Sequence, residues 1–394
     1  MRILVSWDNP QQAELLSLFL DHDGNEPVIC TGRPEALSAA GDGLWDVILM
    51  AVDPRDFDGA FDHFEALRHA LPDCPVVAAC YPQDVYRIAR FMTHGLRTYL
   101  IRDDAGDFVF MLRSILESTV DSVRAERERF VAERLRQEVE SVRRLQESII
   151  PNDLRSPRGY QIVARYESSQ IQVLGGQPVV MAGGDYYDAF MLDDDSLVLL
   201  LGDASGHGMK ACMSIMTMHT LIRAMRNEGY RDTAAFVAEV NRRLCEQDIV
   251  ADEGGFITLL FAILRADTHE FQWTSAGHPS PLLHELEADR VSPLGTIDDG
   301  GLPLAIMPDA EYEAHVAAIP PLSRLLLYTD GLEEAFPEQA AHLEFGRAGT
   351  ERVLKSCRSR TLADTLQALF DASHDFTGGA GRHDDTSVVL LERS

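Results

Sequence analysis

The 394-residue sequence has few basic residues for its length, and this shortage argues against whole classes of partner. It contains 35 Lys and Arg against 63 Asp and Glu, which gives a formal net charge of −28 at pH 7. Nucleic-acid backbones and anionic membrane surfaces both attract clustered Lys and Arg, so the composition argues against binding to either. An acidic chain fits a protein that works with divalent cations or with protein partners.

Long apolar runs and paired cysteines are also missing. No stretch approaches the ~18 consecutive apolar residues that a membrane span needs. The N-terminal "MRILVSWDNP" lacks the long apolar segment and the cleavage site of a signal peptide. The six cysteines show no C-x-x-C spacing, which favours a reducing compartment over a disulfide framework. We therefore expect a cytoplasmic protein of two or three domains with no membrane contact.

Between residues 1 and 118, short β-rich runs alternate with amphipathic helical stretches. The runs are "RILVS", "PVIC", "WDVILMAV", "CPVVAAC" and "RTYLI". Such alternation predicts a parallel sheet covered by helices on both faces. The five-strand pattern resembles the receiver domain of two-component response regulators, which implies an α/β flavodoxin-like fold for this segment.

The receiver resemblance fails at the residues that carry receiver chemistry. Receivers have an acidic pair after the first strand, an aspartate phosphoacceptor at the end of the third, a hydroxyl after the fourth and a lysine after the fifth. In that order the present chain has Trp7 with Asp8, Ala51, Cys80 and Arg102. Because alanine cannot accept a phosphoryl group, we predict a pseudo-receiver that has no phosphoacceptor and acts through an unidentified regulatory partner. Asp53, two residues further on and on the same strand face, is the alternative acceptor.

Residues 119–150 read as one long helical linker. The stretch from 107 to 150 contains no Pro or Gly. Apolar residues recur in it at spacings of three and four, at Val131, Leu135, Val139, Val142, Leu145 and Ile149. An apolar seam flanked by Arg and Glu predicts a coiled coil, most simply a parallel homodimer. The alternative is that the seam packs on the chain's own domains. Pro151 should end the helix, because proline lacks the backbone N–H and clashes with the preceding turn.

The remainder, residues 151–394, predicts an α+β domain. Strand-like runs such as "SLVLLLGD" and "GFITLLFAILRA" follow one another through short turns. Helical stretches lie near residues 207–227, 232–247 and 361–373. Consecutive strands of this kind imply antiparallel sheets with segregated helices. The chain is therefore predicted to be multidomain, with boundaries at 1–118, 119–150 and 151–394.

Four acidic sites in this last segment border apolar, strand-like runs. They are Gly184-Asp185, Gly202-Asp203, Asp330-Gly331 and Asp384-Asp385. Taken singly, each is a commonplace turn pair. If the strands are neighbours, however, their ends bring four carboxylates to one edge, and such a set of like charges favours a bound cation.

The same stretches carry a family resemblance. "GGDYYD", "GDASGHG", "AGHP", "YTDGLEEA" and "HDDTSVVLL" occur in the order of the signature of metal-dependent PPM-type serine/threonine protein phosphatases. Over residues 146–394 the chain resembles their bacterial, RsbU- and SpoIIE-like branch. The resemblance implies a sandwich of two antiparallel sheets flanked by helices, with two Mn²⁺ or Mg²⁺ ions. It assigns the ions to the carboxylates of Asp185, Asp203, Asp330 and Asp384 and to the backbone carbonyl of Ala204. Asp385 either ligates or orients its neighbour.

The resemblance also implies an activity, to which there are two alternatives. Metal-activated water would hydrolyse phosphoserine or phosphothreonine on a phosphoprotein such as a STAS-domain anti-sigma-factor antagonist, under control of the pseudo-receiver and the dimeric linker. "GGDYY" is similar to the GGDEF hairpin of diguanylate cyclases, but a cyclase has no use for the later carboxylates. The stronger alternative is a non-catalytic adaptor, whose mark would be the loss of metal-binding aspartates. No such loss occurs in this sequence.

Overall fold

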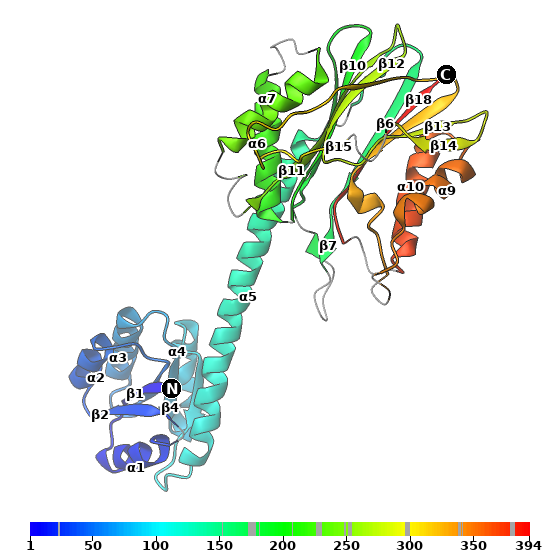
Figure 1. The fold of residues 1–394 in the computed structure, drawn as a ribbon. Helices are drawn as coiled ribbons and strands as arrows, with labels where there is room; N and C mark the ends of the chain where they lie inside the picture. The colour runs from blue at the N-terminus through cyan, green and yellow to red at the C-terminus, as the bar shows by residue number, and fades with distance from the viewer. Residues whose placement is uncertain are drawn as a thin grey trace. The chain divides into compact units, whose positions relative to one another are not determined.

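The computed structural model has two compact units (Figure 1), residues 1–135 and 136–394. Each unit has its own apolar core. It describes every residue except 23, 152, 172–178, 181, 207, 226–230, 248–249, 251–253, 296–299, 338–339, 341 and 379–382. Within the described part, no helix has the length and apolar content needed to cross a bilayer.

The N-terminal unit is built on a five-stranded parallel sheet of order β2-β1-β3-β4-β5. Its strands are β1 (Arg2–Ser6), β2 (Glu26–Cys30), β3 (Val47–Ala51), β4 (Val76–Cys80) and β5 (Thr98–Ile101). Its helices are α1 (Pro10–Leu20), α2 (Arg33–Gly41), α3 (Phe57–Ala70), the 3₁₀ helix η1 (Pro82–Ile88) and α4 (Ala89–Thr93). Apolar clusters cover both faces, since Val47 and Leu49 belong to one and Ile48 and Met50 to the other. The predicted parallel α/β fold is confirmed, and its strand order is the flavodoxin-like one. Kinship with receivers stays a prediction.

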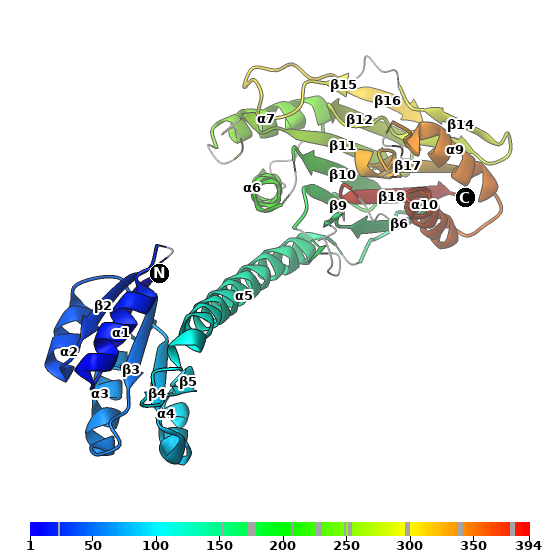
Figure 2. The ribbon, with the colours of Figure 1, turned by 90° about the horizontal axis from the view of Figure 1, so that it is seen from below.

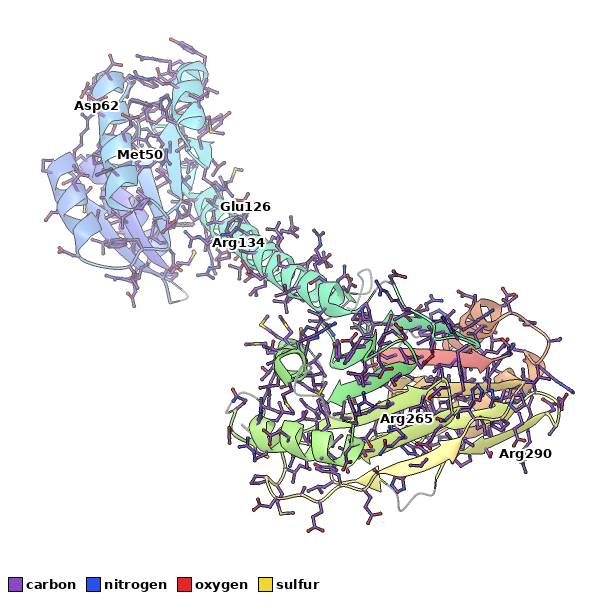
Figure 3. All side chains as sticks on the ribbon, turned by 90° about the horizontal axis from the view of Figure 1, so that it is seen from above. Met50, Asp62, Glu126, Arg134, Arg265 and Arg290 are labelled. Atoms are coloured by element: carbon purple, nitrogen blue, oxygen red, sulfur yellow. The ribbon has the colours of Figure 1, made fainter. Side chains whose placement is uncertain are left out.

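Helix α5 (Val109–Ile149) is continuous across the predicted linker. Its first turns pack on the N-terminal sheet through Leu112 and Leu116, which are fully buried. Its middle turns are exposed and carry both signs of charge, as Glu126 and Arg134 show in Figure 3. The helix ends just before Pro151, as expected. The division between the two units falls inside the predicted linker, and the homodimer stays a prediction.

The C-terminal unit is a sandwich of two sheets. One has the order β15-β12-β11-β10-β9 with β16 beside β12, and the other β14-β13-β17-β18-β6. The first contains β9 (Asp185–Met191), β10 (Ser196–Ala204), β11 (Ile257–Arg265), β12 (Glu270–Ala276), β15 (Gly300–Gly301) and β16 (His315–Ala318). The second contains β6 (Tyr160–Glu167), β13 (Leu282–Glu285), β14 (Arg290–Pro293), β17 (Ser323–Tyr328) and β18 (Thr386–Arg393). Apart from the β12–β15 pair, all neighbouring strands in both sheets are antiparallel.

Helices cover the outer faces of this sandwich (Figure 2). Helices α6 (Met209–Met225) and α7 (Thr233–Cys245) pack on the first sheet, and α9 (Gly346–Ser356) and α10 (Leu362–Phe376) pack on the second. A short hairpin of β7 (Gln170–Ile171) and β8 (Val179–Val180) lies outside both sheets. The predicted α+β sandwich is confirmed, and α9 is an addition to it. Sequence reasoning overlooked α9 because Gly346 and Gly349 lower its helix propensity.

Candidate metal centre

Two of the predicted aspartates are direct cross-strand neighbours in the first sheet. Asp185 opens β9 and pairs with Asp203, one residue before the end of β10. The amide of Ala204 donates to the carbonyl of Gly184 at 2.9 Å. A Cβ on Gly184 would lie 2.7 Å from the carbonyl oxygen of Ala204 and 3.2 Å from Oδ1 of Asp203. Glycine is therefore required here, because any side chain would push the strand away from these two oxygen atoms.

The other two aspartates come from the second sheet. Asp330 follows β17 in the 3₁₀ turn η5 (Asp330–Leu332), and Asp384 comes two residues before β18. Because β17 and β18 are antiparallel and Tyr328 pairs with Val388, the end of one strand and the start of the other lie at the same edge. Asp330 and Asp384 are both partly buried.

Hydrogen bonds join the two sheets at this edge. The Thr329 hydroxyl donates to Oδ2 of Asp185 at 2.6 Å. Asp385 accepts from the amide of Ser169 at 2.7 Å through Oδ1 and from the amide of Gly184 through Oδ2. Both carboxylate oxygens of Asp385 are thus engaged with backbone donors. Of the two roles that the sequence left open for Asp385, this arrangement favours orientation of the Asp185 turn over ligation.

The charges at this edge perturb one another strongly. Burial, and after it the charges of the neighbouring aspartates, raises the pKa of the Asp203 carboxyl to about 11. Burial also raises the pKa of Asp384 to about 7. Burial followed by the charge of Asp385 holds the pKa of Asp185 well above its ordinary value. These carboxylates are therefore close enough to repel one another, and a divalent cation would relieve that repulsion.

The donor set fits a hard divalent ion. Carboxylate and carbonyl oxygens are the ligands that Mg²⁺ and Mn²⁺ prefer. Oδ1 of Asp330 is buried and has no hydrogen-bond partner within the described structure, so it is available as a ligand. Among the described residues, no three His, Cys, Asp or Glu side chains converge tightly enough to hold an ion as they stand.

Sequence reasoning missed the side chains that hold this edge in place. Thr329 lies inside the quoted "YTDG", and Gln146 lies inside "LQESIIP", the last turns of α5. Neither was recognised, because a hydroxyl or an amide in a single sequence gives no sign of which buried group it meets. The "AGHP" histidine, His278, is buried and bonds to Thr258. His207, which belongs to the quoted "GDASGHG", lies outside the described residues.

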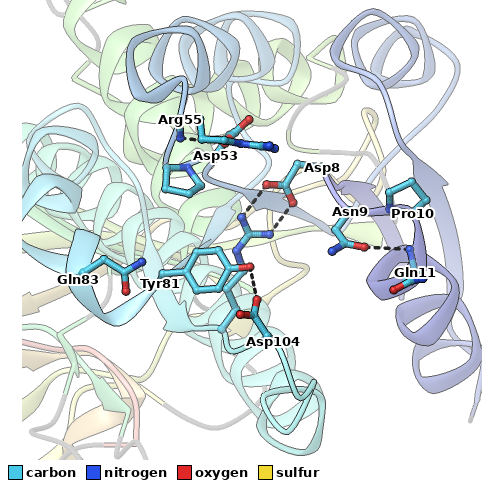
Figure 4. A pocket seen from close by; sticks show the side chains of 11 residues that line it. Asp8, Asn9, Pro10, Gln11, Asp53, Arg55, Tyr81, Gln83 and Asp104 are labelled. Atoms are coloured by element: carbon cyan, nitrogen blue, oxygen red, sulfur yellow. Dashed lines mark hydrogen bonds and ion pairs between the residues drawn. The ribbon is translucent and has the colours of Figure 1, made fainter.

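A polar cavity of about 850 Å³ lies in the N-terminal unit, at the carboxyl edge of its parallel sheet (Figure 4). Arg102, which is 1% exposed, donates to both oxygens of Asp8 at 2.5 and 2.6 Å and to the carbonyl of Val52 at 3.0 Å. Asp53 also lines the cavity and forms an ion pair with Arg55. Ala51 is the last residue of β3, the position at which receivers carry their phosphoacceptor aspartate. That this unit has no phosphoacceptor there stays a prediction.

The fold and the acidic edge together define a class, an α+β two-sheet sandwich with a cluster of aspartates at one edge. The family model "Stage II sporulation protein E (SpoIIE)" matches residues 193–394, which is just over half of the chain. The chain therefore belongs to the SpoIIE family. Asp203, Asp330 and Asp384 lie within the matched residues, whereas Asp185 precedes them.

Individual relatives extend this comparison. Protein IcfG from Synechocystis sp. is 24% identical over 284 residues, which cover 66% of this chain and 42% of that protein. Phosphoserine phosphatase RsbU from Bacillus subtilis is 24% identical over 219 residues, 55% of this chain and 61% of that protein. The SiaA-PP2C domain of Pseudomonas aeruginosa shares the fold with a TM-score of 0.54 at 15% identity, over 67% of this chain and 99% of that one. The chain thus spans between two fifths and about three fifths of the length of these two curated relatives.

Proposed function

We propose that this chain is a metal-dependent protein phosphatase that hydrolyses phosphoserine or phosphothreonine on a protein partner. The observation that carries the proposal is the set of four carboxylates, Asp185, Asp203, Asp330 and Asp384, at one edge of the sandwich. Their raised pKa values support the proposal, because a divalent cation would relieve the repulsion among these buried carboxylates. Membership of the SpoIIE family and similarity to a phosphoserine phosphatase support the same reaction.

Each residue has a defined part in this reaction. Asp185 and Asp203 would hold two Mn²⁺ or Mg²⁺ ions from the first sheet, together with the carbonyl of Ala204, and Asp330 and Asp384 would hold them from the second. Such ions lower the pKa of bound water to near neutrality and stabilise charge on a transferring phosphoryl group. Thr329 and Asp385 keep the Asp185 turn in position through their hydrogen bonds.

Substrate and regulation form the finer part of the proposal. The substrate class proposed is a phosphorylated STAS-domain anti-sigma-factor antagonist, in a cytoplasmic pathway. The receiver-like unit and a homodimer through residues 119–150 would control the enzyme through α5. Support comes from the continuity of α5 between the two units and from exposed apolar residues on its middle turns, such as Val131 and Leu135.

The decisive experiment measures hydrolysis of p-nitrophenyl phosphate and of a phosphoserine peptide by the full chain, with and without Mn²⁺. Asp203→Asn and Asp330→Asn should each lower Mn²⁺-dependent turnover by at least about 100-fold, the usual cost of losing a preorganised electrostatic group. Asp194→Asn, in the exposed turn between β9 and β10, is the matched control and should keep full activity. Absence of Mn²⁺-dependent hydrolysis of either substrate would favour the non-catalytic adaptor.

A further inference from the structure

One polar side chain of α5 is fully buried although the turns around it are largely exposed. Gln146 is 0% exposed, whereas Arg144, Leu145 and Ser148 are exposed on the same turns. All of these residues belong to the C-terminal unit. A buried amide carries two donors and an acceptor, and each needs a partner. The direction of the Gln146 side chain is therefore determined by its hydrogen bonds.

Those bonds reach the turn that carries Asp185. Nε2 of Gln146 donates to the backbone carbonyl of Asp185 at 3.2 Å, and Oε1 accepts from the amide of Gly183 at 2.8 Å. Nε2 also lies 3.3 Å from the hydroxyl of Tyr166. Gly184 lies between the two turn residues that Gln146 contacts, and its amide donates to Asp385. The backbone from Gly183 to Asp185 is therefore held by α5 on one side and by the start of β18 on the other.

We propose that Gln146 is a positioning residue through which α5 and the Asp185 carboxylate fix each other's position. The proposal rests on the function proposed above and specifies where the helix could act on the metal centre. The part assigned to Gln146 is separate from that of the ligands, because within the described structure its side chain bonds to backbone groups of the turn and to the Tyr166 hydroxyl, and to no carboxylate.

The helix geometry makes this contact sensitive to register. One residue along an α-helix corresponds to a rise of about 1.5 Å and a rotation of about 100°. A shift of one residue would present either Leu145 or Glu147 to the turn. The leucine offers no hydrogen bond, and the glutamate places a negative charge against the carbonyl of Asp185. Only the register of α5 that places Gln146 against the turn supplies hydrogen bonds to both Gly183 and Asp185. By thermodynamic linkage, a ligand that fixes the position of Asp185 must also stabilise that register of α5.

The experiment measures this coupling in the full chain with Mn²⁺ as the probe. Gln146→Met keeps the length of the side chain and good helix propensity while removing its hydrogen bonds. We expect Mn²⁺ affinity, measured by calorimetry, to fall about 10-fold, in the range found for partners of metal ligands. We also expect Mn²⁺ to slow amide hydrogen exchange of residues 143–149 in the original chain and not in the variant. A purely structural role would lower thermal stability without removing this Mn²⁺-dependent protection.

Two further variants complete the test. Ser148→Ala is the matched control, since the hydroxyl of Ser148 is exposed and donates to the helix carbonyl of Leu145, and it should behave as the original chain. Gln146→Glu keeps an acceptor for Gly183 and loses the donor to Asp185. It should abolish the protection even if Gln146→Met folds poorly.

The outcomes separate this proposal from the phosphatase activity. Unchanged Mn²⁺ affinity in the Gln146 variants, or equal Mn²⁺-dependent protection of α5 in them, would overturn the positioning role and leave the activity standing. Mn²⁺ binding with protection of α5 but without hydrolysis would overturn the activity alone. Failure of the original chain to bind Mn²⁺ would overturn both.

Discussion

Each of the two units has aspartates at one edge of its sheets, and their negative charge is balanced differently at the two edges. In the N-terminal unit, the Arg102 guanidinium forms a two-bond ion pair with Asp8 and lies over the rings of Trp7 and Tyr81, at 5.4 and 4.5 Å from their centroids. In the C-terminal unit, the carboxylates of Asp185 and Asp203 face other aspartates, and their pKa values are raised. The first edge carries a guanidinium of its own chain, and at the second edge the proposed function supplies the positive charge as a bound divalent cation.

The difference teaches how similar residues lead to different functions. The Arg102 guanidinium is part of the chain, so it neutralises Asp8 at all times. The stability of the N-terminal edge therefore does not depend on whether an ion is bound. Buried aspartates without such a partner destabilise the fold, and binding of a cation removes that destabilisation. The stability of such an edge therefore depends on whether an ion is bound. The N-terminal edge therefore fits a fixed pseudo-receiver, and the C-terminal edge fits a metal centre.

Removal of the Arg102 guanidinium should give the largest change in stability. Arg102→Ala leaves the partly buried Asp8 carboxylate unpaired and removes the packing on Trp7 and Tyr81. We expect it to destabilise the N-terminal unit by about 2 kcal/mol, because the Val52 carbonyl loses its hydrogen bond and the packing of the buried Arg102 side chain is lost. Calorimetry of the full chain would measure this effect, with the C-terminal transition identified by its shift on addition of Mn²⁺. Arg55→Ala, at a side chain that is 86% exposed, is the control, and an equal effect of the two substitutions would contradict the comparison.

Removal of a carboxylate at the other edge should change stability in the opposite direction. In the presence of a chelator, Asp203→Asn replaces a buried, repelled carboxyl by a neutral side chain of the same shape. The melting temperature of the C-terminal unit should rise, by about 2–4 °C for each kcal/mol of repulsion removed. The same substitution should abolish most of the stabilisation by Mn²⁺. A fall in the melting temperature of the metal-free variant would show that the aspartates do not repel one another.

The pH dependence of stability follows from the raised pKa values, with a definite sign. The folded protein holds protons on Asp384 and Asp203 at pH values where the unfolded chain has lost them, so the metal-free C-terminal unit is stabilised at low pH. This stabilisation should decline as the pH rises from about 4, the ordinary aspartate range, through the Asp384 pKa of about 7. Because ions compete with these protons, the stabilisation by Mn²⁺ should grow between pH 6 and 8. Thermal melts with chelator and with Mn²⁺ measure both trends, and rising stability of the chelated protein over this range would refute the argument.

The sequence predicted much of the fold and the positions of the acidic residues at one sheet edge, for reasons that particular residues make clear. Strand and helix periodicity located β10, β17 and α5, because their apolar spacing is regular over many residues. Motif order identified the acidic positions, and the structure brings Asp185 and Asp203 together as neighbours. The bond from Gln146 to the Asp185 turn spans 39 residues. No local pattern encodes such a contact, since it depends on how the end of α5 packs against the sandwich.

The smallest effect is expected at Asp53, and it tests the pseudo-receiver directly. The ion pair of Asp53 joins it to Arg55 at 3.3 Å on the surface, and exposed pairs contribute about 0–1 kcal/mol. Asp53→Asn should therefore leave the stability of the N-terminal unit almost unchanged. Since Arg102 already neutralises Asp8, the edge lacks the free acidic pair that would hold Mg²⁺ for phosphoryl transfer. Incubation of the full chain with acetyl phosphate and Mg²⁺ should accordingly leave its intact mass unchanged. A phosphorylated product that disappears in Asp53→Asn would make Asp53 the acceptor and would remove the contrast between the two edges.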